Sequence, residues 1–417
     1  MRIGIVSTWF ERGAAYVSRQ YSDILKSRHE VYIYARGGEK YALGDSDWDK
    51  SYVTWGKKPY INIPTAIEMD DFKGWLEMKK IDVVLFNEQS WWMPIELCNR
   101  LGIIAGSYID YYTEKTIPFF AAYDFLICNT LRHMSAFSWH PGCHYVPWGT
   151  DIDLFTPHSL DARRTGYITF FHSAGMNPYR KGCDFVLRSF KHVQGPAQLV
   201  IHSQQPLKLF FPNLTELIEE LQACGRLELH EYTVSAPGLF HLGDVYVYPT
   251  RLEGIGLTIM EALSCGLPVI TTNDGPMNEF ISHGVNGRLV AVDKLVARWD
   301  GYYWPQAFIN ESDLTEQMQW YVDRIDDIPS FKSIARQTAL DKFDWILNSS
   351  SLPIWFENLN LLPHDQKDKA ITQILDFEEA RSKKHCFTRY EIICTRLQND
   401  YPALFRVFSN IKQAMRP

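Results

Sequence analysis

The sequence predicts an α/β protein with two doubly wound parallel sheets and a helical C-terminal extension. Three observations carry this prediction. In the first 150 residues, short strands that are apolar on both faces alternate with amphipathic helices, which is typical of a parallel sheet covered on both sides. The pattern restarts after Pro157, and from about Asp313 the chain becomes helical.

The first series begins with a strand at Arg2–Ser7, a loop through Trp9–Gly13 and a helix at Ala14–Arg28. Further strands are predicted at Glu30–Tyr34, Asp82–Phe86, Ile103–Tyr108, Phe125–Cys128 and Tyr145–Val146. Since all of them are short and apolar, they fit one parallel sheet.

The second series has a helix at Cys183–Val193 between its first two strands. Its strands are predicted at Tyr167–His172, Gln198–Ile201, Leu227–His230, Val245–Tyr248 and Pro268–Thr272. Helices follow at Leu314–Ile325, Ser333–Leu347 and Pro353–Leu361, and the last stretch, Asp365–Met415, also has a helical pattern.

These series divide the chain into domains at residues 1–150 and 151–342, which we expect to face each other across a cleft. Residues 343–417 would form a crossover helix around Phe343–Leu361 and a tail that returns to the first domain. Ligands of open α/β sheets bind at the carboxyl ends of the strands, so both sheets offer a site.

Composition excludes several classes of protein. The chain has 417 residues, of which 46% are hydrophobic, so it is not largely disordered. A formal charge of −7 argues against a nucleic-acid-binding protein. The eight cysteines contain no C-x-x-C pair, which predicts reduced thiols in the cytoplasm rather than disulfides or a zinc site. We expect no signal peptide and no membrane span.

The segment from Gly243 to Val290 offers most of the chemistry. A strand is followed by a loop at Pro249–Ile255, and Gly256 or Leu257 begins a helix that ends near Cys265. The N-terminus of that helix would lie at the carboxyl edge of the sheet, where free N–H groups and the positive dipole end attract an anion. The segment therefore predicts a phosphate site.

Two carboxylates flank this site with the spacing E-x7-E. Glu253 lies in the loop and Glu261 about one turn into the helix. A carboxylate beside a phosphate is costly unless it binds something else, and sugar or ribose hydroxyls are suitable because they donate hydrogen bonds. The alternative is that both residues only complement the helix dipole.

With two further motifs, this segment resembles the retaining GT-B glycosyltransferases of family 4. The family carries E-x7-E just after a strand that leads into Pro-Ser/Thr. Pro147-Trp148-Gly149-Thr150-Asp151, with Phe155 and Pro157, is similar to its interdomain segment P-N-G-V-D…F-x-P. Gly275-Pro276 with Glu279, followed by Gly284-Val285-Asn286-Gly287, is similar to its G-G-x-x-E…G-x-N-G. The resemblance implies the GT-B fold, with an acceptor-binding domain before a nucleotide-sugar-binding domain.

The resemblance implies that the loop Gly175–Gly182 holds the donor diphosphate. Lys181 matches a lysine of the family, but Met176 stands where members usually have an arginine. We therefore expect Arg180 to share that role. The two cations, beside the N-terminus of the following helix, would stabilise the departing diphosphate.

The resemblance also assigns the rest of the donor. Glu253 would hold sugar hydroxyls and Glu261 the ribose. The other expected donor contacts are Gly175, Gly254, Ile255, Gly256, Leu257 and Glu279, with the nucleotide base near Glu231 and Tyr232. Glu279 has an alternative role as a brace of its loop.

The acceptor is expected in the first domain. Asp110 follows a strand where many family members carry a histidine, and it joins Glu253, Lys181 and Arg180 as a catalytic candidate. Gly13, Trp91 and Tyr111 are the acceptor-binding candidates. Aromatic residues gather at these strand ends, and aromatic faces stack on sugar rings: Trp9, Phe10, Trp91, Trp92, Tyr111 and Tyr112. Packing in the core is the alternative for them.

The resemblance implies a metal-independent reaction that retains the anomeric configuration and needs no cofactor beside the nucleotide-diphospho-sugar. Asp151-Ile152-Asp153 looks like a D-x-D metal motif, but Asp151 belongs to the interdomain segment, so we expect no metal. A glycan, a lipid-linked molecule or a small molecule is favoured as the acceptor over nucleic acid. The basic tail is either a solvated face or a contact to a membrane or a second subunit.

Two other functions remain open at this point. One is a catalytically silent GT-B subunit that binds a nucleotide and acts as a scaffold. The other is a nucleotide-sugar epimerase on the same fold.

Overall fold

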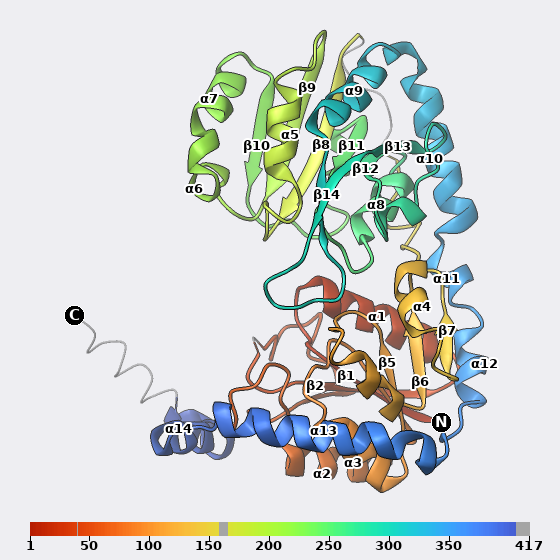
Figure 1. The fold of residues 1–417 in the computed structure, drawn as a ribbon, viewed down its shortest axis with the longest axis vertical. Coiled ribbons are helices and arrows are strands. Elements are labelled where there is room, and N and C mark those ends of the chain that lie inside the picture. The colour runs from red at the N-terminus through yellow and green to blue at the C-terminus, as the bar shows by residue number, and fades with distance from the viewer. Residues whose placement is uncertain (40, 158–165, 406–417) are drawn as a thin grey trace. The chain divides into compact units, whose positions relative to one another are not determined.

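The computed structural model describes residues 1–39, 41–157 and 166–405, and the chain divides into two compact units (Figure 1). Unit 1 comprises Met1–Cys128, His133–Tyr145 and the chain from Ser350 onward, and unit 2 comprises Asn129–Arg132 and Val146–Ser349. The predicted end of the tail, residues 406–417, and residues 158–165 of the predicted second domain lie outside the described residues.

Unit 1 contains, in the described residues, a seven-stranded parallel sheet with the order β3-β2-β1-β4-β5-β6-β7. Its central strands are buried because helices cover both faces, which confirms the parallel sheet expected from the apolar runs. The strands are β1 (Arg2–Ser7), β2 (Glu30–Ala35), β3 (Val53–Trp55), β4 (Val83–Phe86), β5 (Ile104–Tyr108), β6 (Phe125–Cys128) and β7 (Cys143–Tyr145).

The helices of unit 1 come from both ends of the chain. Those before residue 146 are α1 (Gly13–Leu25), α2 (Met69–Lys79), α3 (Met93–Leu101), the 3-10 helix η1 (Ile117–Ala122) and α4 (Leu131–Phe137), whose first two residues belong to unit 2. The late ones are α12 (Leu352–Glu357), α13 (His364–His385) and α14 (Arg389–Asp400).

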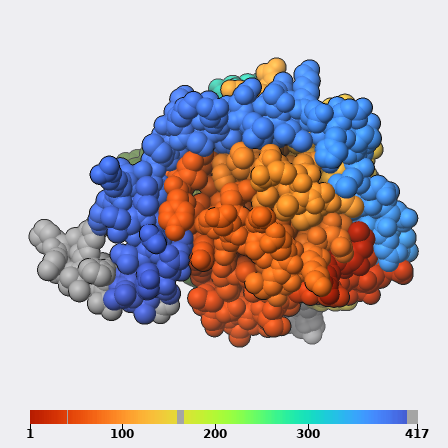
Figure 2. Space-filling model, turned by 90° about the horizontal axis from the view of Figure 1, so that it is seen from below, coloured from red at the N-terminus to blue at the C-terminus, as the bar shows by residue number. Residues whose placement is uncertain are grey.

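The C-terminal helices pack on unit 1, and Figure 2 shows this blue segment lying over its red and orange surface. Contacts of α13 are polar as well as apolar. The buried Glu378 accepts a hydrogen bond from the backbone N–H of Trp92 at 3.1 Å, and the ring of Phe377 lies 5.2 Å from that of Phe119. The tail is therefore part of the body of unit 1.

Unit 2 contains, in the part of the chain described, a six-stranded parallel sheet with the order β10-β9-β8-β11-β12-β13. Its strands are β8 (Ile168–Gly175), β9 (Ala197–Ser203), β10 (Leu227–Glu231), β11 (Val245–Tyr248), β12 (Val269–Thr272) and β13 (Gly287–Val290). An antiparallel hairpin, β14 (Val292–Val296) with β15 (Gln306–Ile309), follows and was not predicted from the sequence.

Two helices of unit 2 begin directly after the two loops that the sequence predicts to bind phosphate. The α-helices are α5 (Cys183–Phe190), α6 (Leu207–Phe210), α7 (Thr215–Ala223), α8 (Leu257–Ser264), α9 (Glu311–Val322), α10 (Ile328–Lys342) and α11 (Trp345–Asn348). The 3-10 helices are η2 (Pro212–Leu214), η3 (Phe240–Leu242), η4 (Met277–Glu279) and η5 (Ile325–Asp327). The starts of α5 at Cys183 and of α8 at Leu257 confirm the predictions.

The expected crossover helix over Phe343–Leu361 is wrong, because two short helices, α11 and α12, replace it. The carboxylate of Asp344 caps α11, and Pro353 lies in the first turn of α12, where its missing N–H does no harm. The helix expected at Ser333–Leu347 ends already at Lys342.

The tail is also not one continuous helix. It breaks after His385, and a capping box between Thr388 and Glu391 starts α14. The helical pattern of the sequence continues through the break, so periodicity alone does not reveal it.

Candidate functional site

Two loops meet at the carboxyl end of the sheet of unit 2, because β8 and β11 are neighbouring strands. They are residues 176–182, after β8, and residues 249–256, after β11. The carbonyl oxygen of Arg180 accepts a hydrogen bond from the backbone N–H of Arg251 at 2.8 Å, and the Thr250 hydroxyl oxygen lies 3.0 Å from it. At Gly182 φ is +77°, and a Cβ would lie 2.2 Å from the carbonyl oxygen of Pro249, so this contact requires glycine.

The Glu253 carboxylate lies at the centre of this meeting point and is 7% exposed. Its Oε1 is 2.6 Å from Lys181 Nζ, and its Oε2 is 3.1 Å from a terminal nitrogen of Arg180. The hydroxyls of Tyr248 and Thr250 each donate to Oε1 at 2.8 Å. One carboxylate thus gathers both cations of the neighbouring loop.

These contacts set the protonation states. Burial alone would raise the pKa of Glu253, but Arg180 and Lys181 outweigh it and hold that pKa at about 2. Burial, reinforced by Arg180, lowers the pKa of Lys181 to about 8. At neutral pH the cluster therefore holds two cations and one anion, so it has an excess positive charge.

Glu261 lies on α8 and is half-buried. Burial raises its pKa to about 7, although Lys181 acts in the opposite direction. Among the described residues, no hydrogen bond or ion pair engages its carboxylate. Near neutral pH it can therefore offer both oxygens to a hydroxyl-bearing ligand.

The sequence segment that forms this cluster matches a known protein family. Residues 167–299, which include both loops, match the family model described as "Glycosyl transferases group 1". This segment of the chain is therefore similar to group 1 glycosyltransferase domains. The E-x7-E pair and both cations lie inside it.

Curated relatives match a similar part of the chain. A probable sucrose-phosphate synthase from Thermosipho melanesiensis is 27% identical over 158 residues, which are 35% of this chain and 36% of that protein. A GDP-mannose-dependent monoacylated alpha-(1-6)-phosphatidylinositol monomannoside mannosyltransferase from Corynebacterium glutamicum is 27% identical over 36% of this chain and 44% of its own length. The matches thus span less than half of either relative.

Solved structures match nearly the whole fold. HepE from Anabaena, in complex with UDP and glucose, superposes with a TM-score of 0.66 at 16% identity, over 86% of this chain and 100% of that one. Sucrose-phosphate synthase from Thermosynechococcus elongatus has a TM-score of 0.66 at 15% identity, over 86% and 99%. The chain has two Rossmann-like units and a helical tail, as these structures do. It therefore has the GT-B fold.

Within residues 167–299, two of the glycines expected around the donor border open space. A Cβ at Gly175 or at Gly254 would meet no atom within 4 Å, whereas Gly256 has a φ of +88° and serves as the N-cap of α8. Ile255 is buried and Leu257 half-buried. The donor contacts expected of these residues stay predictions.

Residues expected to meet the nucleotide base lie at the end of β10. Glu231 is exposed and accepts a hydrogen bond from the backbone N–H of Leu207 at 2.7 Å, at the start of α6. Tyr232 is 50% exposed, and its hydroxyl lies 3.0 Å from Nδ1 of His230.

Glu279 has both carboxylate oxygens engaged at the start of α4. They accept the backbone N–H groups of Leu131 at 2.6 Å and Arg132 at 2.8 Å. These hydrogen bonds fit the alternative role of Glu279, which is to hold its loop in place. The expected contact of Glu279 with the donor stays a prediction.

Position 176 contributes no charge to this cluster, because it is a methionine. Met176 is 64% exposed and points its thioether at Gln205, 3.7 Å away. Arg180, four residues further on, reaches the Glu253 carboxylate and the carbonyl oxygen of Leu252, the latter at 2.9 Å. The cluster therefore has its second cation from a different place in the loop.

A group of at least three side chains able to hold a metal ion is absent from the part of the chain that the structure describes. In the D-x-D-like segment, Asp151 Oδ1 accepts the backbone N–H groups of Asp153 at 3.0 Å and Leu154 at 2.9 Å, and so closes a local turn. No helix among the described residues has the length and apolar character needed to cross a bilayer.

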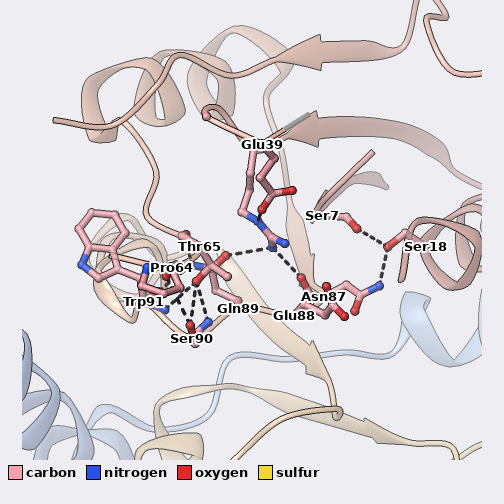
Figure 3. Close-up of polar contacts among 12 residues, drawn as sticks. Ser7, Ser18, Glu39, Pro64, Thr65, Asn87, Glu88, Gln89, Ser90 and Trp91 are labelled. Carbon is pink, nitrogen blue, oxygen red and sulfur yellow. Dashed lines mark hydrogen bonds and ion pairs between the residues drawn. The ribbon is translucent and has the colours of Figure 1, made fainter. Parts of the chain in front are cut away.

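Unit 1 presents a polar cluster at the carboxyl edge of its own sheet (Figure 3). The buried Arg36, after β2, pairs with Glu39 at 2.9 Å and donates to the carbonyl oxygen of Asn87 at 2.7 Å. Glu88, next along the chain, has a φ of +50°, a strained conformation for this residue type. It pairs with Arg12 at 3.1 Å.

Asp110, the catalytic candidate of unit 1, follows β5 at this edge and is half-buried. Burial, and next the negative charge of Glu88, raise the pKa of Asp110 to about 8. At neutral pH it retains its proton, so it can donate a hydrogen bond to an oxygen or exchange a proton with one.

The aromatic residues expected to face an acceptor divide into two groups. Tyr111 is 39% exposed and Phe10 is half-buried, whereas Trp9, Trp91, Trp92 and Tyr112 are all below 7% exposed. For these four the expectation of free ring faces is wrong, since the interior of unit 1 encloses them. Gly13 is exposed at the first position of α1, in open space.

Sequence reasoning missed two residues of the cluster. Tyr248 is the last residue of β11, a strand predicted only as an apolar run, and its hydroxyl donates to Glu253. Arg251, in the loop of residues 249–256, is 1% exposed, but a single arginine in a loop gives no signal of burial.

Proposed function

We propose that the chain is a retaining, metal-independent glycosyltransferase that moves a sugar from a nucleotide-diphospho-sugar to an acceptor hydroxyl. The observation that carries this proposal is the convergence of Lys181 and Arg180 on Glu253, beside the starts of α5 and α8, inside a group 1 glycosyltransferase domain. A diphosphate needs cations and helix N-termini, and a sugar needs a carboxylate beside them.

The charges support a division of labour in the donor site. Lys181 and Arg180 would hold the diphosphate and stabilise the negative charge that grows as the glycosidic bond breaks. In the part of the chain that the structure describes, Arg180 donates to Glu253 Oε2, and this oxygen can accept a sugar hydroxyl as well. Glu261, whose carboxylate has no hydrogen-bond partner among the described residues, would accept the ribose hydroxyls.

Retention would follow from attack on the face that the leaving group occupies. In that mechanism an oxygen of the departing phosphate takes the proton of the acceptor hydroxyl, so unit 2 needs no carboxylate nucleophile. The pKa of about 2 at Glu253 argues against this residue as the general base, because such a weak base is a poor proton acceptor.

We propose the edge of unit 1 around Asp110 as the acceptor site, with Tyr111 as its exposed aromatic side. A protonated Asp110 and the carboxylate of Glu88 suit a hydroxyl-rich acceptor such as a glycan, a lipid-linked sugar or a small polyol. The free state of all eight cysteines supports a cytosolic location for the reaction.

Incubation with UDP-glucose, UDP-N-acetylglucosamine, GDP-mannose and ADP-glucose tests the proposal. We expect one donor to be hydrolysed slowly without an acceptor and faster with a matching one, and NMR of the product to show the anomeric configuration of the donor. A folded protein that neither binds nor hydrolyses any donor would refute it.

Two other outcomes correspond to the alternative functions. Binding of UDP or GDP without any turnover would identify a scaffold, and an isomerised nucleotide-sugar would identify an epimerase. Activity abolished by chelation of metal ions would contradict metal independence.

The variant Asp110→Asn separates the two sites. It should reduce transfer to an acceptor roughly 100-fold while donor hydrolysis stays at the wild-type rate. Loss of donor hydrolysis to the same extent would overturn the assignment of Asp110 to the acceptor.

A further inference from the structure

Arg251 is among the largest fully buried side chains in the described residues, with 1% of its surface exposed. A buried guanidinium requires a partner, and it has one in Asp184, in the first turn of α5. Two nitrogens of Arg251 each donate to a different carboxylate oxygen of Asp184 at 2.8 Å. This paired fork fixes both the distance and the plane of the two groups.

The guanidinium is also held on its flat faces and at its edge. Its central carbon lies 3.9 Å from the ring centre of Tyr179 and 3.8 Å from that of Phe185. A terminal nitrogen donates to the carbonyl oxygen of Tyr179. Arginine suits this site better than lysine, because only a planar cation can pair bidentately and contact aromatic faces together.

The backbone of Arg251 joins the same elements. Its N–H donates to the carbonyl oxygen of Arg180, and its own carbonyl oxygen accepts the N–H of Ala307 in β15, both at 2.8 Å. Arg251 therefore connects the loop of residues 176–182, helix α5 and the hairpin, while Glu253 lies two residues further along the same loop.

We propose that Arg251 is a positioning residue, which through its fork with Asp184 holds Lys181 and Arg180 in register with Glu253. This inference rests on the proposed function, since it assigns Arg251 a role in donor binding and turnover rather than in folding alone. The side chain itself touches neither reacting group. It acts through the backbone of Tyr179 and Arg180, directly before Lys181.

The consequence of loosening this connection is specific. Without the fork, the loop carrying Lys181 is free to move away from Glu253, and water reaches the ammonium group. Misplacement of reacting groups by about 1 Å can reduce a rate 100-fold. The Arg251→Lys variant should therefore lose roughly 10- to 100-fold in kcat/KM for the donor, with an increase in KM.

The decisive readout is the pH profile of kcat/KM for hydrolysis of the donor that the wild-type chain uses. Burial holds the pKa of Lys181 at about 8, against an ordinary value of 10.5. In Arg251→Lys, and in Asp184→Asn as a second route to the same loosening, the alkaline limb should move upward from about pH 8. The position of this limb does not depend on how much of the sample is folded, so partial unfolding does not obscure it.

Lys332 provides the matched control. It forms a buried ion pair of unit 2 with Asp244, at 3.3 Å, with 11% and 12% of the side chains exposed, at the opposite end of β11 from the loop of Arg251. Lys332→Met should lower the melting temperature and leave the pH profile unchanged. Addition of guanidinium ions should partly restore the rate of Arg251→Ala, because the ion fits the space that the truncation leaves.

The outcomes separate the two proposals. A wild-type chain without turnover of any donor refutes the proposed function. An active wild-type chain whose Arg251→Lys and Asp184→Asn variants keep the alkaline limb at the wild-type position refutes the positioning role, even if both variants are less stable.

Discussion

The ammonium nitrogen of Lys181 lies 2.6 Å from Oε1 of Glu253, and this ion pair neutralises part of the charge available for a diphosphate. Arg180 pairs with the other oxygen of the same carboxylate at 3.1 Å. The proposed anion site and the proposed sugar-binding carboxylate are thus each other's partners. A donor must share these cations with Glu253 or displace it.

Glu253→Gln should therefore affect binding and turnover in opposite directions. Removal of the negative charge frees Lys181 and Arg180, so UDP or GDP should bind roughly tenfold more tightly, which corresponds to about 1.4 kcal/mol. Turnover should fall about 100-fold or more, since the sugar loses its carboxylate. Isothermal titration calorimetry and nucleotide release measure the two effects.

Lys181→Met is the comparison for that experiment, because it removes a cation and should weaken nucleotide binding. If Glu253→Gln weakens binding as much as Lys181→Met does, the carboxylate organises the cations rather than competing for them.

Donor turnover should decline in alkaline solution as Lys181 loses its proton. Because burial and Arg180 hold its pKa at about 8, kcat/KM should fall about tenfold for each pH unit above that value. Lys181→Arg keeps its charge at every accessible pH, so its profile should be flat through pH 9. A wild-type profile that is flat as well would mean that another group carries the charge.

Glu261→Gln should reveal a pH-dependent cost to folding. The folded state raises the pKa of Glu261 from 4.5 to about 7, so this group's contribution is fully favourable below about pH 4.5 and is lost as the pH rises through 7. Glutamine stays neutral at every pH. The free energy of unfolding of the variant, relative to that of the wild type, should therefore increase by about 1–3 kcal/mol as the pH rises from 5 to 8.

Chemical denaturation at both pH values measures this gain. Glu216→Gln, on the exposed face of α7, is the control and should show no such trend. An equal effect of Glu261→Gln at pH 5 and pH 8 would contradict the shifted pKa.

Lys367→Met should destabilise unit 1, because the tail is docked through a buried charge. Lys367 is 1% exposed, forms an ion pair with Asp124 and donates to Oδ1 of Asn99 at 2.8 Å. Removal of one member of a buried pair costs about 3–5 kcal/mol. Lys369→Met, at an exposed position of the same helix, should change stability by about 0.5 kcal/mol or less. Equal melting temperatures for the two variants would show that the buried pair does not hold the tail.

Local sequence determined the two parallel sheets and the starts of α5 and α8. A strand is predicted by an apolar run of a few residues, and each helix start by the glycine directly before it, Gly182 or Gly256. Both signals can therefore be recognised from neighbouring residues alone. The same holds for Glu253, Glu261 and Lys181, whose spacing within one βαβ unit or one loop is a local property.

Tertiary structure alone decided which of these groups meet. Arg180 reaches Glu253 because β8 and β11 are neighbours, and that adjacency brings two loops together from about seventy residues apart. Arg251 is buried for the same reason, and four of the six aromatic residues lie in the interior instead of facing a ligand. Burial and long-range pairing depend on the packing of distant segments, so the sequence determined the chemistry available to this protein and the packing decided where that chemistry acts.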